Sequence, residues 1–174
     1  MATPEEGKAL ARSLAALVKL GVVPGIAALL DKGTVDVARR LQKTLLAEIA
    51  AFTASGNPDV LPELARHAGE HITELRRLLA GGALRDFEFV RAHARRRAGQ
   101  RFPLEAMLHA YRSGHKVLSQ WISEAAIAAK PRSRADIAAA VAAFSIEYTD
   151  AVSIVLAAEY VAQTRALAEA EGDQ

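Results

Sequence analysis

Apolar residues recur every three or four positions along most of the chain, which is the spacing of one face of an α-helix. The clearest stripe lies in the last third of the sequence and consists of Ile137, Val141, Phe144, Tyr148, Val152 and Val155. Further apolar residues there fall on other faces, namely Ile146, Ile154 and Val161. This pattern predicts a helix that is buried centrally or shared with a second chain. No alternation of apolar and polar residues, typical of strands, is present.

Prolines, glycines and capping residues divide the pattern into seven predicted helices. They span about 4–20, 24–32, 34–54, 58–79, 84–98, 103–130 and 133–171. Thr3 is the predicted cap of the first helix, and Gly33 followed by Thr34 is predicted to separate the second helix from the third. The sequence thus predicts an all-α fold: one domain over residues 1–174, a helical bundle of about six to seven helices with a long C-terminal helix. No stop signal precedes Gly172, so we expect that helix to continue into a linker in a longer protein.

Composition supports packed helices. Hydrophobic residues make up 51% of the chain but aromatic residues only 5%. Alanine, the best helix former, accounts for much of the hydrophobic fraction. There is no cysteine, which excludes disulfides and thiolate chemistry and fits a reducing compartment. The N-terminus lacks the pattern of a signal peptide, and the longest apolar stretches are interrupted by acidic residues. We therefore predict a cytoplasmic protein that does not interact with a membrane.

The net charge of +2 is unevenly distributed. Residues 85–116 carry eight Lys or Arg against three Asp or Glu, and five arginines form a basic block: Arg91, Arg95, Arg96, Arg97 and Arg101. Arg91 and Arg95 share a helix face, whereas Arg97 points elsewhere. Neither a recognition-helix motif nor interleaved aromatic residues accompany the block, so direct nucleic-acid binding is not expected. A solvated or partner-facing surface is the prediction.

The sharpest local motif is His67-Ala-Gly-Glu-His71, which has the H-x-x-E-H spacing of inverted zincins. Two histidines four residues apart on a helix can bind one zinc ion, and the glutamate can act as a base. A catalytic zinc needs a third protein ligand, and no recognisable motif supplies one. We therefore favour two histidines beside the core stripe, with no metal, and keep a site at His67 and His71 as the alternative.

Other histidines suggest a second alternative. His115 occupies an apolar-stripe position, where a satisfied core histidine is the favoured interpretation. A haem sensor would need an axial histidine, for which His71, His93 and His115 are candidates. The scarcity of aromatic residues to line a macrocycle argues against haem, and no cofactor is predicted. No phosphate loop, nucleophile elbow or catalytic carboxylate pair is present, so no enzymatic activity is expected.

Residues 91–121 carry a family resemblance. Its features are an Arg- and Ala-rich helix followed by Gly99, Pro103-Leu104, Leu108, Ala110-Tyr111-Arg112, Gly114 and Trp121. This stretch resembles the N-terminal helical domain of PucR/CdaR-type transcription regulators. The same RsbRD-N-like domain type takes its name from RsbR-like co-antagonists of the stressosome. Physically, Tyr111 needs a partner for its hydroxyl, Arg112 could form an ion pair or bind an anion, and Gly114 would be explained by close packing.

The resemblance implies the input half of a bacterial transcription regulator. Such a domain would sense a signal and form a homodimer, with no catalysis and no DNA binding by itself, and would act on a downstream DNA-binding domain of the same protein. A small-molecule effector would be expected near Tyr111, Arg112 and His115, with His71 and Trp121 as further candidates. Two alternatives stay open: a stressosome RsbR-like partner-binding module, and a haem- or metal-binding helical sensor.

Overall fold

The structure is a computed structural model that describes residues 4–173 and shows only helices and their connections in that range. The helices are α1 (Pro4–Leu20), α2 (Val23–Glu48), α3 (Ala50–Ala54), α4 (Val60–Leu79), α5 (Glu88–Gly99), α6 (Leu104–Ala129) and α7 (Arg134–Gly172), with a 3-10 turn at Pro131–Ser133. The predicted all-α fold with a long C-terminal helix is confirmed. The predicted cap at Thr3 lies outside the described residues.

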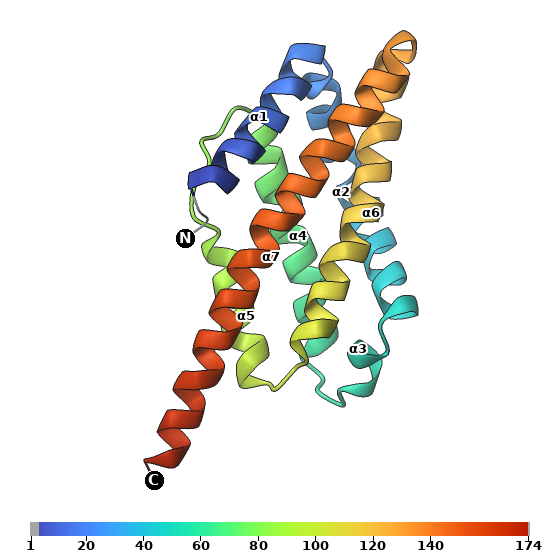
Figure 1. Ribbon diagram of the computed structural model, residues 1–174. Coiled ribbons are helices and arrows are strands. Elements are labelled where there is room, and N and C mark those ends of the chain that lie inside the picture. The colour runs from blue at the N-terminus through green and yellow to red at the C-terminus, as the bar shows by residue number, and fades with distance from the viewer. Residues whose placement is uncertain (1–3, 174) are drawn as a thin grey trace.

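Helix α7 organises the bundle. It runs diagonally across the molecule and packs against α1, α5 and α6, while α2 packs against α4 and α6 (Figure 1). The six residues of its predicted stripe, from Ile137 to Val155, are all buried. Beyond Val161 the helix leaves the bundle, and its last turns project past the ends of the neighbouring helices (Figure 1).

One helical segment of residues 4–173, Pro131–Gly172, is long and apolar enough to cross a membrane by length and composition, and α1 with α2 would be a second only if that bent pair formed one span. Within the bundle, 44% of the most apolar window of the segment is buried. Burial of this kind explains the apolar composition, because a helix at the centre of a bundle is apolar on more than one side.

The predicted break at Gly33 is wrong. Helix α2 runs without interruption from Val23 to Glu48, and the hydroxyl of Thr34 donates to the carbonyl of Leu30 instead of capping a new helix. Gly33 is needed for packing: a Cβ placed on it would lie 2.8 Å from Cζ2 of Trp121. The glycine therefore admits the indole ring against α2, so a residue that indicates a helix end in the sequence serves here as a contact point between two helices.

Gly114 shows the opposite situation. A Cβ at Gly114 would lie 3.5 Å from Cδ2 of Leu41, an ordinary van der Waals contact, so close packing does not require this glycine. The expectation that packing explains Gly114 is therefore wrong.

The two glycines give a matched pair of substitutions. Gly114→Ala is expected to raise the free energy of unfolding by about 0.5–1 kcal/mol, because alanine loses less backbone freedom in a helix. Gly33→Ala is expected to lower it by about 1–3 kcal/mol, because the new methyl group meets a rigid ring. Urea unfolding followed by the fluorescence of Trp121, the single tryptophan, measures both. A Gly33→Ala protein at least as stable as the Gly114→Ala protein would contradict the packing argument.

Several predicted boundaries shift. The predicted helix over 34–54 is divided at Ile49, whose extended backbone separates α2 from α3. Helix α4 begins at Val60, two residues after the predicted start, and α5 begins at Glu88, because residues 83–87 form an irregular connection. The helical spacing of apolar residues also predicts that Leu61 and Leu84 point inward, but both are exposed.

The corner between α5 and α6 also differs in detail. Gly99 was expected to end α5, but it lies inside the helix, and the positive φ of 55° belongs to Arg101. The amide of Phe102 then donates to the carbonyl of Arg97, over 2.9 Å, which closes the helix end. A non-glycine residue in this conformation is uncommon, so the sequence could not indicate it.

Candidate functional site

A chain of buried histidines and tyrosines lies at the centre of the bundle. On α4, His67 and His71 share one face, as the four-residue spacing predicts, and their Nε2 atoms are 3.0 Å apart. The Nε2 of His67 also lies 2.9 Å from the hydroxyl of Tyr111 on α6. The Nδ1 of His71 lies 2.9 Å from the hydroxyl of Tyr148 on α7, and the Nδ1 of His67 lies 3.0 Å from Oε2 of Glu70. Three helices thus contribute to one hydrogen-bond network.

The partners fix where the protons of this network lie. A carboxylate only accepts, so Nδ1 of His67 donates to Glu70, and its Nε2 is an acceptor in the neutral ring. The Nε2 of His71 can then donate to His67, which leaves Nδ1 of His71 to accept from Tyr148. Tyr111 donates to the same Nε2 of His67. One lone pair on His67 therefore receives two donors.

His93 of α5 completes the cluster from the other side. Its ring stacks on that of His67, with centroids 3.6 Å apart and 6° between the planes. The side chain is 5% exposed, and its Nδ1 has no hydrogen-bond partner among the described residues. A buried polar atom without a partner is costly and uncommon in folded proteins, so this nitrogen is a candidate for binding a further polar group.

The environment keeps the three imidazoles uncharged. Burial lowers the pKa of His67 to about 3, and the positive charges of Arg96 and Arg97 act in the same direction. Burial likewise lowers the pKa of His71 well below its usual value, and the neighbouring His67 adds to this effect. For His93, burial again is the main cause of a strongly lowered pKa. At neutral pH the network thus consists of neutral rings and protonated phenols, because burial also raises the pKa of Tyr111 and Tyr148.

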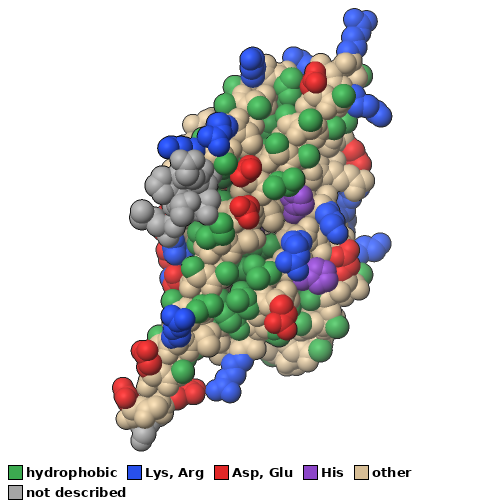
Figure 2. All heavy atoms as spheres, in the orientation of Figure 1, with side chains coloured by type: hydrophobic (Ala, Val, Ile, Leu, Met, Phe, Trp, Pro, Cys, Tyr) green, Lys and Arg blue, Asp and Glu red, His purple; other side chains and the backbone are tan. Residues whose placement is uncertain are grey.

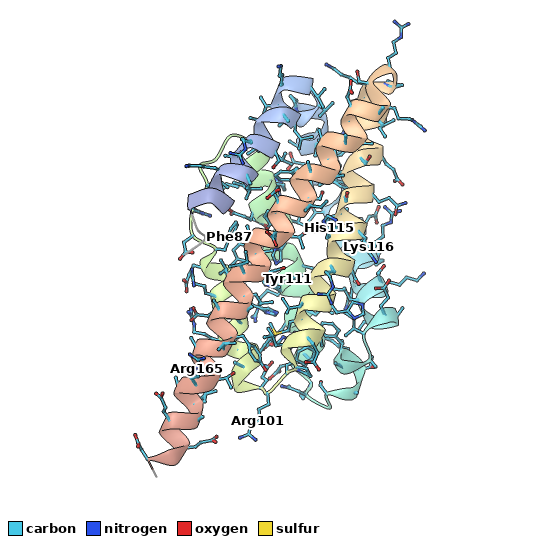
Figure 3. The ribbon with its side chains drawn as sticks, in the orientation of Figure 1. Phe87, Arg101, Tyr111, His115, Lys116 and Arg165 are labelled. Carbon is cyan, nitrogen blue, oxygen red and sulfur yellow. The ribbon has the colours of Figure 1, made fainter. Side chains whose placement is uncertain are left out.

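A cavity of about 80 Å³ adjoins the network. Its polar lining comprises His67, His71, His93, Tyr111, His115 and Tyr148, together with Arg97 and Thr149. Its apolar lining includes Leu41, Leu45, Phe52, Leu64, Met107 and Val152. Tyr111 and His115 reach it from the side of α6 that faces the bundle interior (Figure 3), where the Nδ1 of His115 lies 3.1 Å from the hydroxyl oxygen of Thr149. Helices α2, α4, α5, α6 and α7 all contribute to this one site.

The structure separates the predicted effector residues into two groups. His71, Tyr111 and His115 line the cavity, and the expected partner of the Tyr111 hydroxyl is His67. Arg112 and Trp121 do not line it: Arg112 is exposed, and Trp121 packs over Gly33. Helix geometry explains the difference, because consecutive residues point about 100° apart.

The metal and haem alternatives do not fit this geometry. In the range 4–173 no three His, Asp or Glu side chains are arranged to hold a metal ion, and the two histidines of the H-x-x-E-H motif are hydrogen-bonded to each other. The space beside the proposed haem ligands is about 80 Å³, and a tetrapyrrole macrocycle is many times larger.

Sequence reasoning did not place Tyr148, Thr149 or His93 in an effector site. Tyr148 was assigned to the core stripe, and the signal that could have found it is its hydroxyl, which a buried tyrosine must satisfy. His93 was considered only as a haem ligand. Its position one turn before the buried Arg97 on α5 was visible in the sequence, but the face that it presents to α4 was not.

Four arginines of the basic block bind within the chain, whereas the buried Nε and Nη2 of the fifth, Arg96, have no partner among the described residues. Arg91 and Arg95 point to the same side, as predicted, and their Nη1 atoms lie 3.3 and 2.9 Å from the carboxylate oxygens of Glu159 on α7. The hydroxyl of Tyr160 donates to the carbonyl of Phe102 over 2.6 Å. Helix α5 therefore contacts α4 through the face that carries His93 and binds α7 through the face that carries Arg91 and Arg95.

Comparison with known proteins gives one result. No curated protein and no solved structure matches the chain. A family model, described as the RsbT co-antagonist protein rsbRD N-terminal domain, matches residues 35–174, which include α3 to α7 and most of α2. The chain therefore belongs to the RsbRD N-terminal domain family.

Proposed function

We propose that this chain is the input half of a PucR-like bacterial transcription regulator, a sensory and dimerisation domain that acts in the cytoplasm without catalysis and without binding DNA itself. Membership of a family of helical regulatory domains supports a signalling role. The resemblance of residues 91–121 to PucR-type regulators supports the transcriptional context. A downstream DNA-binding domain of the same protein would receive the signal.

The observation that carries the proposal is the course of α7. Tyr148, Thr149 and Val152 of this helix line the central cavity, and Glu159 binds α5 about two to three turns later. The same helix then projects beyond the bundle (Figure 1). A rigid helix that touches an internal site at its middle and leaves the domain at its end can transmit a shift in packing over a distance. We assign the sensing part to the cavity and the output to α7.

The outer face of α7 supports the homodimer. We use this name for the exposed apolar residues on the side away from the buried stripe: Ala139, Ala142, Ile146, Ile154, Ala158 and Val161; the exposed Asp150 lies between Ile146 and Ile154 on the same side. Ile146 is 57% exposed and Val161 is 40% exposed. Hydrophobic side chains follow the diagonal course of α7 on the molecular surface (Figure 2). One patch on one helix can pair with its own copy around a two-fold axis, and alanines allow the two helices to approach closely.

A lysine on this face is expected to prevent dimerisation. In sedimentation velocity over a concentration series, the wild-type chain should shift from monomer to dimer, and Ile146→Lys should weaken the association at least tenfold, because a strongly hydrated ammonium group would replace an apolar contact in the interface. Val35→Lys is the matched control, since Val35 is 69% exposed on α2, away from this face. Both variants should keep the wild-type circular dichroism spectrum. A wild-type chain that stays monomeric at every concentration would contradict the dimer.

A partner-binding module of the stressosome type is the second candidate. The description of the matching family, a co-antagonist of RsbT, favours it. In that case the output of α7 would be a protein partner instead of a DNA-binding domain. The codons that follow Gln174 in the gene distinguish the two, because a helix-turn-helix domain supports the regulator and its absence from the same protein supports the module.

A further inference from the structure

We propose that the central cavity binds a small uncharged molecule with a carbonyl-like hydrogen-bond acceptor, which takes the hydroxyl proton of Tyr111 as its donor. This inference rests on the proposed sensory function and names the chemistry of its signal. Tyr111 lies inside the bundle between α6 and α7, one helical turn before His115 (Figure 3).

The first argument is the excess of donors at His67. Its Nε2 offers one lone pair, yet it lies 3.0 Å from Nε2 of His71 and 2.9 Å from the Tyr111 hydroxyl. Glu70 holds the other nitrogen of the ring as a donor, so His67 cannot present a second lone pair. The Tyr111 hydroxyl can therefore turn toward an acceptor in the cavity while His71 keeps the lone pair of His67 satisfied.

The second argument is the unpartnered nitrogen of His93. This side chain also lines the cavity, and its Nδ1 is buried with no partner among the described residues. The Nε of Arg97, which also lines the cavity, has no partner there either, so the cavity adjoins three side chains whose hydrogen-bonding capacity is not used up by the described residues. The rest of the wall is largely aliphatic, including Leu41, Leu45 and Met107. Such a combination of an apolar wall and a few placed polar groups is typical of sites for small molecules.

The third argument concerns charge and size. Three neutral imidazoles and two protonated phenols line the cavity, together with His115 and with Arg97, whose Nη1 lies 3.5 Å from Oε2 of Glu63 and whose Nε has no partner among the described residues. A cation would be desolvated there beside the charge of Arg97, and an anion would compete with Glu63 for that charge, so an uncharged molecule fits best. A cavity of about 80 Å³ is roughly half the size of one that accepts benzene, which limits the molecule to about five heavy atoms.

The single methionine of the described residues makes the test direct. Met107 lines the cavity, and the other methionine is Met1, so a ¹³C-methyl label gives at most two signals, and Met107→Leu identifies the one that reports on the site. The 174-residue chain would be titrated with four probes of similar size: cyclobutanone, methylenecyclobutane, cyclobutylammonium and propionate. We expect cyclobutanone to shift the Met107 signal saturably. Methylenecyclobutane, which lacks the acceptor, should bind about tenfold more weakly, and the two ions should not saturate the signal.

Two tyrosine variants assign the hydrogen bond. Tyr111→Phe is expected to weaken cyclobutanone binding about tenfold and to leave methylenecyclobutane binding unchanged. Tyr160→Phe is the matched control, because its hydroxyl binds the Phe102 carbonyl outside the cavity. No saturable shift with either uncharged probe, or equal cyclobutanone affinity in the wild-type and Tyr111→Phe proteins, would overturn the proposal.

The same titration on the Ile146→Lys variant separates this inference from the proposed function. Ile146 does not line the cavity, so its substitution leaves the site intact. Binding of cyclobutanone by the monomeric variant would support the site without the dimer, and the same binding by a wild-type chain that stays monomeric at every concentration would support the site and count against the dimer. A dimer whose Met107 signal does not respond would overturn the ligand site alone.

Discussion

Lowering the pH from about 7.5 to about 5 is expected to destabilise the fold by about 6 kcal/mol through His67, His71 and His93. In the unfolded chain a histidine has a pKa of about 6.5 and binds a proton as the pH falls. In the folded protein the three rings stay neutral, and His67 takes up a proton only near pH 3. Each ring therefore contributes stability that is present above pH 6.5 and is lost on acidification, about 2 kcal/mol of it by pH 5.

The size of this loss is comparable to the whole stability of a typical domain, which is about 5–15 kcal/mol. Urea unfolding at a series of pH values between 7.5 and 5 measures the loss of free energy of unfolding. The slope per pH unit should fall by about one third in His93→Gln, because this ring supplies one of the three protons and its Nδ1 has no hydrogen-bond partner among the described residues for the substitution to remove. A free energy of unfolding that stays constant from pH 7.5 to pH 5 would show that the rings are not buried as neutral groups.

The helices were predictable because they follow from local physics. The α7 stripe is apolar at helical spacing over its whole buried length, and Gly21 and Gly81, both with positive φ, end α1 and α4 as expected. The error at Gly33 had a non-local cause. Whether a glycine ends a helix or admits a neighbouring ring depends on what lies opposite, and Trp121 is far away in the sequence.

The candidate site was predictable only in part. The spacing of four places His67 above His71, and the same spacing places His115 on the face of Tyr111. Geometry also argues against two predicted members: Arg112 lies about 100° from Tyr111 around the helix, and Trp121, ten residues on, lies about 80° away on the other side. The sequence alone would therefore have been enough to exclude both residues from the predicted effector site.

The sequence could not predict which helix faces meet at the site. His67 and Tyr111 are 44 residues apart, and His71 and Tyr148 are 77 residues apart. Their meeting depends on how α4, α6 and α7 cross, which no local pattern encodes. The same holds for Arg97: its separation from Arg91 and Arg95 was predicted, but its complete burial depends on groups of α4 and of the corner after α5.

Arg97→Ala is expected to lower the free energy of unfolding by about 3–5 kcal/mol, the usual result of breaking a buried ion pair. The side chain is fully buried, its Nη2 donates to the Val60 carbonyl over 3.2 Å, and its guanidinium lies over the ring of Phe102 at 4.9 Å. Its Nη1 lies 3.5 Å from Oε2 of Glu63, a carboxylate that the substitution would leave without its cation. Urea unfolding at pH 7.5 is the measurement, with Arg101→Ala, at an exposed position, expected to change the value by less than about 0.5 kcal/mol.

A pair of further variants separates the charge from the packing. Arg97→Met restores most of the volume against Phe102 but leaves Glu63 buried near an apolar group, so it should recover only the part of the loss that comes from the cavity. Adding Glu63→Met removes the unpaired carboxylate, and the double variant should regain at least half of what Arg97→Met loses, because replacing both charges by apolar groups is often nearly neutral. If the double variant were instead less stable than Arg97→Met, Glu63 would stabilise the fold through Gln100, whose Nε2 lies 3.1 Å from its Oε2, and not through Arg97. The comparison thus decides whether Glu63 of α4 holds the end of α5 mainly through Arg97 or mainly through Gln100.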